Sequence, residues 1–167
     1  MIKVVLIICL LLCSCGTAAK VYRVADPRDV NKGSLSELNP RYTSRYRIPY
    51  VKTDGVDQSY EWWSSYIDNQ MSEYAACVKN KFGRDPQLNK LRNIKIIIVK
   101  DSKFECKYHS GRCSGEYDAE RGIILVARKD VGKDGFIPLI KHEWSHANGI
   151  LKSDHSNLGY VEKCTRY

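Results

Sequence analysis

Two histidines and a glutamate stand together in the stretch His142-Glu143-Trp144-Ser145-His146. Residues four apart lie on the same face of a helix, about one turn from each other, so both imidazole rings can reach one metal ion. Glu143 follows the first histidine, and its carboxylate can come close to that ion without binding it. This HExxH spacing is typical of two zinc ligands, His142 and His146, with Glu143 as a general base.

The residues around the motif predict a helix over about residues 136–148. Pro138 suits a first helical turn, and Gly149 stands where a helix commonly ends. Four apolar residues recur at helical spacing on a face different from that of the histidines: Ile140, Trp144, Ala147 and Leu151. One face of this helix can therefore pack against the protein while another face carries the ligands.

A catalytic zinc ion needs a third protein ligand and keeps its fourth position for water. Three residues downstream of the motif have suitable side chains: Asp154, His155 and Glu162. His155 is the predicted ligand, because imidazole suits zinc and because it follows His146 by only nine residues. Asp154 can instead orient the His155 ring by accepting its second N–H. Asp154 and Glu162 remain the alternative ligands.

His142, Glu143, His146 and Gly149 together form the pattern HExxHxxG, and through it the chain resembles the zincin metallopeptidases, in a metzincin-like variant. The resemblance implies a hydrolase that uses Zn²⁺ and acts on peptide bonds. Glu143 is then the catalytic residue that takes a proton from a zinc-activated water and delivers it to the leaving amine.

The metzincin pattern has its third histidine three residues after the glycine, where this chain has Lys152. No methionine follows Met71, so the methionine turn of metzincins has no counterpart here. The resemblance therefore leaves the zincin subfamily open. It also implies that a peptide substrate pairs with an exposed sheet edge beside the metal, and residues 115–127 are the candidate segment.

A long helix is predicted from Ser59 to Phe82, with Ser59 or Asp57 as its N-cap and Gly83 after its end. Apolar side chains at steps of three and four form one buried stripe: Trp63, Ile67, Met71, Tyr74, Val78 and Phe82. The stripe is typical of a helix that packs on a core.

Apolar, β-branched runs predict strands at residues 94–99 and 122–127, the first of them central in a sheet. Shorter strands are predicted at 104–108 and 115–117, and residues 45–51 read as an extended segment on the domain edge. The fold class is therefore α+β. By the resemblance it is a minimal zincin-like fold: a small mixed sheet, a long N-terminal helix and a metal-bearing active-site helix.

The first residues resemble an export signal. Lys3 precedes an apolar run over residues 4–12, and the following Leu12-Cys13-Ser14-Cys15 resembles a bacterial lipobox. This implies a signal peptide over 1–14, a lipid on Cys15, a tether with an extended segment over 15–57, and a peptidase domain over 58–167. The alternative is an ordinary signal peptide that is cut near Ala18 or Ala19.

Four cysteines follow the signal, an even number that suggests two disulfide bonds in an oxidising compartment. Three pairings are possible. Cys106 and Cys113 flank a short loop and could join a hairpin, and Cys77 would then pair with Cys164. The competing interpretation is a Cys/His zinc site that includes His109, although the spacing has no paired CxxC.

The formal net charge of +8 suits anionic lipid headgroups, cell-wall polymers or acidic substrates. Nucleic acid is not an expected partner, because the charge is spread along the chain without a basic helix. The sequence thus predicts a lipid-anchored zinc peptidase of the bacterial cell envelope, acting on protein, peptide or cell-wall peptide. The alternative is a non-catalytic envelope lipoprotein, a binding or assembly factor with a structural zinc site of four protein ligands.

Overall fold

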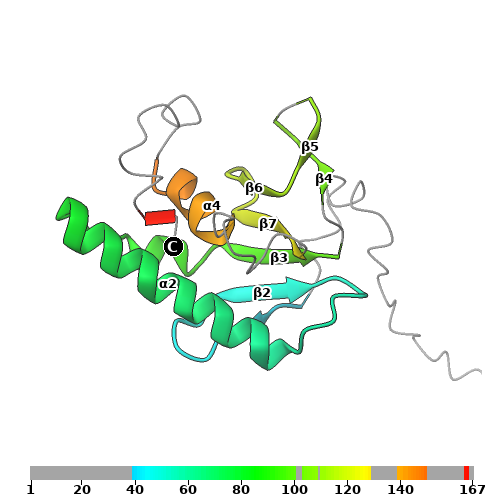
Figure 1. The fold of residues 1–167 in the computed structure, drawn as a ribbon, viewed down its shortest axis with the longest axis horizontal. Helices are drawn as coiled ribbons and strands as arrows, with labels where there is room; N and C mark the ends of the chain where they lie inside the picture. Colours follow the sequence, from blue (N-terminus) through cyan, green and yellow to red (C-terminus); the bar gives the residue numbers. More distant parts are fainter. Residues whose placement is uncertain (1–38, 101–102, 109, 129–138, 150–163, 166–167) are drawn as a thin grey trace, which may run out of the picture.

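The computed structural model describes residues 39–100, 103–108, 110–128, 139–149 and 164–165 (Figure 1). Their centre is a five-stranded sheet in the order β1-β2-β3-β7-β6. The strands are β1 (Arg41–Tyr42), β2 (Pro49–Lys52), β3 (Lys95–Val99), β7 (Ile123–Ala127) and β6 (Gly115–Asp118). The three central strands are parallel, and both edge strands are antiparallel to their neighbours. The predicted α+β class with a small mixed sheet is confirmed.

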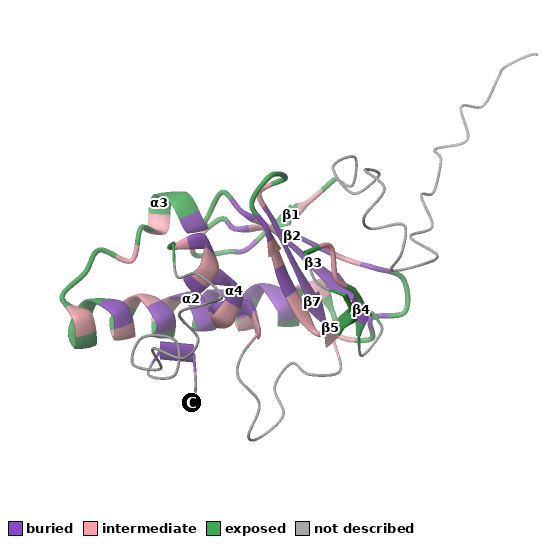
Figure 2. Cartoon of the chain, turned by 90° about the horizontal axis from the view of Figure 1, so that it is seen from above, coloured by how far each residue is buried: buried purple, intermediate pink, exposed green. Residues whose placement is uncertain are grey.

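The sheet is buried on both faces at its centre (Figure 2), as the run of isoleucines in β3 predicts for a central strand. Ile96, Ile98, Ile124 and Val126 face the helices and belong to the main core. The opposite face has its own cluster, which includes Ile97, Val99, Ile123, Leu125 and Ala127. A separate hairpin of β4 (Phe104–Glu105) and β5 (Arg112–Cys113) places Phe104 against that second face.

Helix α2 (Tyr60–Phe82) forms as predicted. The side chain of Ser59 caps its start by accepting a hydrogen bond from the Trp62 N–H, and Gly83 ends it in the left-handed conformation at φ 59°. The predicted stripe faces the core: its first five members are fully buried and Phe82 is partly buried. This helix therefore forms one wall against which the metal-motif helix can pack.

Helix α4 (Leu139–Ala147) carries the histidine motif and contacts β6, β7 and α2 (Figure 1). The rings of Trp144 on α4 and Tyr74 on α2 have centroids 6.0 Å apart. A buried lysine of α4, Lys141, forms an ion pair with Glu73 of α2. Gly149 follows the helix at φ 90°, as expected of a C-terminal glycine. Residues 136–138, where the predicted helix begins, lie outside the described residues.

Four local expectations differ from the structure. The extended segment is not on the domain edge: β2 lies between β1 and β3, so the packed domain includes residues from Arg41 onward. The strand expected at 104–108 is shorter, because β4 ends at Glu105 where the hairpin turns. The strand expected at 115–117 extends to Asp118. A short helix, α3 (Leu88–Leu91), was not predicted, since four residues are too few to show a periodic pattern.

The four cysteines form the two favoured disulfide bonds. Cys106 and Cys113 join the two strands of the β4–β5 hairpin, with Cα atoms 5.4 Å apart. Cys77 of α2 pairs with Cys164, which is buried in the main core. No helix among the described residues has the length and apolar character needed to cross a membrane.

Candidate metal centre

The two histidines of α4 bring their rings together. The Nε2 atoms of His142 and His146 are 3.2 Å apart, and the rings lie at 86° with centroids 4.8 Å apart. Two imidazoles on a tetrahedral zinc ion, each about 2.0–2.1 Å from the metal, have their nitrogens about 3.3 Å apart. The observed separation therefore fits two ligands of one zinc ion.

The packing of α4 explains why the histidines point away from the core. Ile140, Trp144 and Ala147 are buried on one side of the helix, as the sequence predicted, whereas both histidine side chains are only partly buried. The helix is thus fixed by its apolar side, and residues four apart on the other side meet at one point.

Glu143 lies on the flank of α4 that faces the edge strand β6. It is 3% exposed, and its carboxylate approaches the backbone of Gly115 so closely that a Cβ atom there would be 2.6 Å from Oε1. Gly115 does not have a positive φ, so space rather than backbone conformation requires glycine at this position. The general-base candidate is therefore in contact with the strand that borders the site.

Strand β6 has an outer edge that can accept another strand. The Ala127 N–H donates to the Ser114 carbonyl, which makes these residues a hydrogen-bonded pair of the β6–β7 ladder. Because such pairs alternate, the N–H and C=O groups of Gly115 and Tyr117 point away from β7. Within the described ranges no other segment hydrogen-bonds to these main-chain groups.

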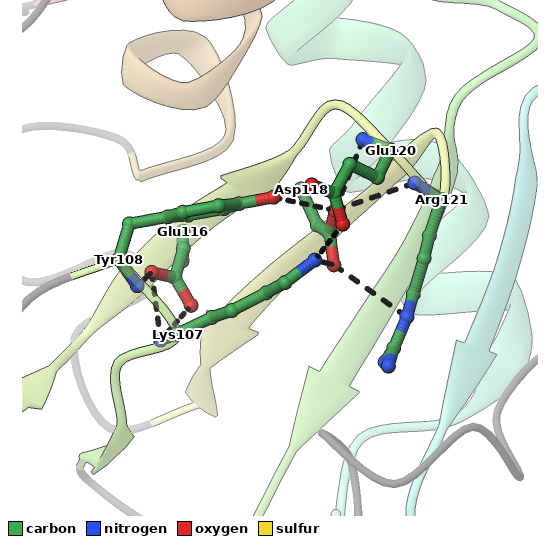
Figure 3. A network of polar contacts seen from close by, with 6 residues as sticks. All are labelled: Lys107, Tyr108, Glu116, Asp118, Glu120 and Arg121. Atoms are coloured by element: carbon green, nitrogen blue, oxygen red, sulfur yellow. Dashed lines mark hydrogen bonds and ion pairs between the residues drawn. The ribbon is translucent and has the colours of Figure 1, made fainter.

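The other face of β6 is fastened to the hairpin by a buried carboxylate (Figure 3). Glu116 is 4% exposed and accepts hydrogen bonds from the backbone N–H groups of Lys107 and Tyr108, at 3.0–3.1 Å. The hairpin and α4 therefore hold β6 from its two faces. This arrangement holds β6 in contact with both the hairpin and the helix that carries Glu143.

A second buried carboxylate, Asp118, extends the same network (Figure 3). It accepts hydrogen bonds of 2.9 Å from the Lys107 ammonium and the Tyr108 hydroxyl, and Arg121 lies nearby. Burial alone would raise the pKa of Asp118, but the hydrogen bonds from Lys107 and Tyr108 outweigh it and hold the pKa below its ordinary value. The carboxylate therefore stays charged at neutral pH.

Several predicted site residues lie outside the described residues. They are the third-ligand candidates Asp154, His155 and Glu162, the lipidation candidate Cys15, and His109. Within the described part of the chain, no group of three or more His, Cys, Asp or Glu side chains is placed to hold a metal ion. The Cys106–Cys113 bond excludes those two cysteines as the thiolate ligands of the competing Cys/His site.

Two described residues anchor the segment that contains the third-ligand candidates. It begins after Gly149, at the end of the motif helix, and ends before Cys164, which is joined to α2. The structure thus brings the rings of His142 and His146 together on the helix that carries Glu143. It also connects the residues on either side of the ligand segment to α4 and α2.

Gly115 and Asp118 are site residues that the sequence interpretation missed. A glycine inside a predicted strand is itself a signal of close backbone approach, although it does not say what approaches. Asp118 gave no such signal, because its burial depends on a hairpin whose position comes only from the fold.

The chain matches no protein-family model, no curated protein and no solved structure.

Proposed function

We propose that the protein is a zinc-dependent peptidase of zincin-like fold, exported and attached to the bacterial cell envelope by a lipid on Cys15. The observation that supports it best is the convergence of the two His Nε2 atoms to 3.2 Å, on the helix that also carries the buried Glu143. His155 is the proposed third ligand.

The roles of the residues follow from their positions. His142 and His146 would hold the metal, which would supply Lewis-acid chemistry at a substrate carbonyl and make a bound water more acidic. Glu143 accepts the proton of the attacking water on its carboxylate and returns it to the leaving amine. Its burial between α4 and Gly115 restricts the carboxylate to a narrow range of positions, which favours proton transfer.

The edge strand β6 is the proposed binding site for an extended peptide. The outward main-chain groups of Gly115 and Tyr117 are two residues apart, the spacing at which an added strand forms its hydrogen bonds. A peptide in this place lies next to Glu143, since Gly115 is in contact with that carboxylate. Main-chain pairing suits a protein or peptide substrate, including a cell-wall peptide.

The test combines metal analysis with one conservative variant. Purified protein is expected to contain one zinc per chain and to hydrolyse unfolded protein substrates in a chelator-sensitive reaction. Glu143→Gln is expected to keep the zinc and to lower hydrolysis by about 10³-fold, because the general base is lost. Full activity in this variant, or a chain that binds no zinc, would reject the proposal.

The same experiment distinguishes the proposed peptidase from the alternative, a non-catalytic lipoprotein with a structural zinc site. A structural zinc site has four protein ligands and no position for water. Zinc that is bound without any hydrolysis of proteins, peptides or purified wall material would therefore favour the non-catalytic lipoprotein.

A further inference from the structure

The β1 edge of the sheet carries arginines stacked on tyrosine rings. Each guanidinium carbon lies 3.9–5.2 Å from the centroid of a ring. The side chains of all three arginines are exposed, and so is Tyr42, at 50%. The pairs are Arg41 with Tyr60, Arg45 with Tyr46, and Arg47 with Tyr42. Arg41, Tyr42, Arg45 and Arg47 are called the β1 patch below.

The β1 patch keeps its positive charge. Among the described residues, none of its arginines forms an ion pair with a carboxylate. Asp68, the buried acid of the neighbouring helix, is occupied by the backbone N–H groups of Arg45 and Tyr46, at 2.7 and 3.1 Å. The Glu61 carboxylate is close enough to Arg41 to balance part of its positive charge. Arg45 and Arg47 therefore supply most of the unbalanced positive charge of the β1 patch.

Arg47 has a backbone conformation that favours another residue. Its φ of 57° is in the left-handed region, where glycine or asparagine folds more easily than arginine. This conformation belongs to the turn between β1 and β2, which the hydrogen bond from the Thr43 N–H to the Ile48 carbonyl closes at 3.0 Å. Stacking leaves N–H groups of a guanidinium available, and these groups match phosphate oxygens. One N–H of Arg45 is already used, because it donates to the Ser72 hydroxyl at 3.0 Å.

We infer that the β1 patch docks the domain on an anionic phospholipid bilayer. Arginines beside such a surface each increase binding about fivefold, and an exposed tyrosine suits the headgroup level. If Cys15 carries the lipid of the proposed function, the tether to Arg41 reaches at most about 90 Å, which raises the local concentration of the patch at the membrane. The patch itself lies in the described domain and does not depend on zinc chemistry.

Docking through the β1 patch orients the candidate metal centre relative to the membrane. β1 and β6 are the opposite edges of the sheet, whose strands follow the order β1-β2-β3-β7-β6. A bilayer at β1 therefore leaves the β6 edge facing away from the lipid, toward substrates in solution or in the cell wall.

The test measures amide hydrogen exchange of residues 41–52 in the full lipidated protein, reconstituted in vesicles. Vesicles of phosphatidylcholine alone are compared with vesicles that contain an equal part of phosphatidylglycerol. Exchange is expected to be several-fold slower on the anionic vesicles, and high salt is expected to abolish the difference. Equal exchange on both vesicles would overturn the inference.

Two variants and a control test which side chains are responsible. R41Q/R45Q/R47Q should exchange equally fast on both vesicles, whereas K79Q/K81Q/R84Q, which removes three exposed charges at the far end of α2, should retain the protection. R47G should lose part of the protection while folding at least as stably, because glycine relieves the left-handed strain. If both triple variants lost the protection from exchange, the effect would depend on total charge and not on the β1 patch. If a soluble anionic wall polymer protected the patch and vesicles did not, the partner of the patch would be the cell wall. Either result would overturn membrane docking.

Discussion

β1 and β6 are the two edge strands of the sheet, and each runs antiparallel to the strand that it pairs with. Their surroundings are opposite in chemistry. β6 has the buried carboxylates Glu143 on one face and Glu116 on the other, with a glycine where Glu143 approaches. β1 is two residues long and is bordered by exposed arginines.

The comparison shows that two edge strands with the same antiparallel pairing can differ in how readily they accept another strand. A short edge strand with charged side chains resists pairing with another strand, so β1 is a poor place for an extended peptide. β6 is longer, and its position is fixed from both faces. Strand addition is therefore expected at β6 alone, and the predictions below test that division.

The largest effect is expected at the histidines. His146→Ala should lower zinc affinity by at least about 10³-fold and abolish hydrolysis, because one of three ligands is lost. Zinc titration by calorimetry and a peptidase assay measure the two effects. His109→Ala is the matched control and should change neither, while His155→Ala should behave like His146→Ala. Unchanged zinc affinity in His146→Ala would show that His146 does not bind the metal, and the β6 edge would then have no metal centre beside it.

The next largest effect is expected at Gly115. In Gly115→Ala the new Cβ atom displaces the flexible end of Glu143, so stability should change by less than about 1 kcal/mol. Hydrolysis should nevertheless fall about 10–100-fold at unchanged zinc content, because a catalytic group is moved by roughly 1 Å. Steady-state kinetics and thermal unfolding check this pair of outcomes. Tyr117→Phe, on the same strand, is the control and is not expected to lower hydrolysis in this way. Full activity of Gly115→Ala would mean that Glu143 does not act from the observed position.

A third effect concerns the stability of the β6 edge. Asp118→Asn should lower the free energy of unfolding by about 2–4 kcal/mol at pH 7, because a buried, hydrogen-bonded charge is lost. The pKa of Asp118 in the folded protein is below its ordinary value of 3.8, so its contribution is present above that value and is lost as the pH falls through the lower one.

Urea unfolding of Asp118→Asn and the wild type at several pH values tests this sign. The difference between them should shrink below about pH 4. Glu120→Gln, which removes a carboxylate that is 75% exposed in the same network, is the control and should cost less than about 1 kcal/mol. A pH-independent difference would show that the Asp118 charge does not contribute.

The smallest effect is expected at the other edge. R41Q/R45Q/R47Q should change the hydrolysis of a soluble peptide by less than about twofold, because the β1 patch lies across the sheet from Glu143 and long-range charge effects are screened. Kinetics in solution, without vesicles, give this number. A tenfold loss would show that the two edges are not independent.

The sequence predicts the local part of this structure well. Ser59, Gly83 and the apolar stripe between them define α2 because capping and periodicity act over a few residues. The spacing of His142 and His146 likewise predicts their meeting, since a helix fixes it.

Local sequence patterns do not predict contacts between segments that are far apart in the chain. The approach of Glu143 to Gly115 depends on where α4 crosses β6, and no local pattern encodes that crossing. The pairing of β2 with β3 was missed for the same reason: the strand has four residues, and its partner is more than forty residues away. The fold had to be known before the two edges could be compared.

The nested disulfide bonds set an order for maturation. The outer bond, Cys77–Cys164, spans 87 residues and encloses the inner bond, Cys106–Cys113, which spans 7. Correct pairing requires Cys106 and Cys113 to join each other while Cys77 stays free for Cys164. A chain with reduced cysteines therefore lacks the covalent link that fastens Cys164 to α2.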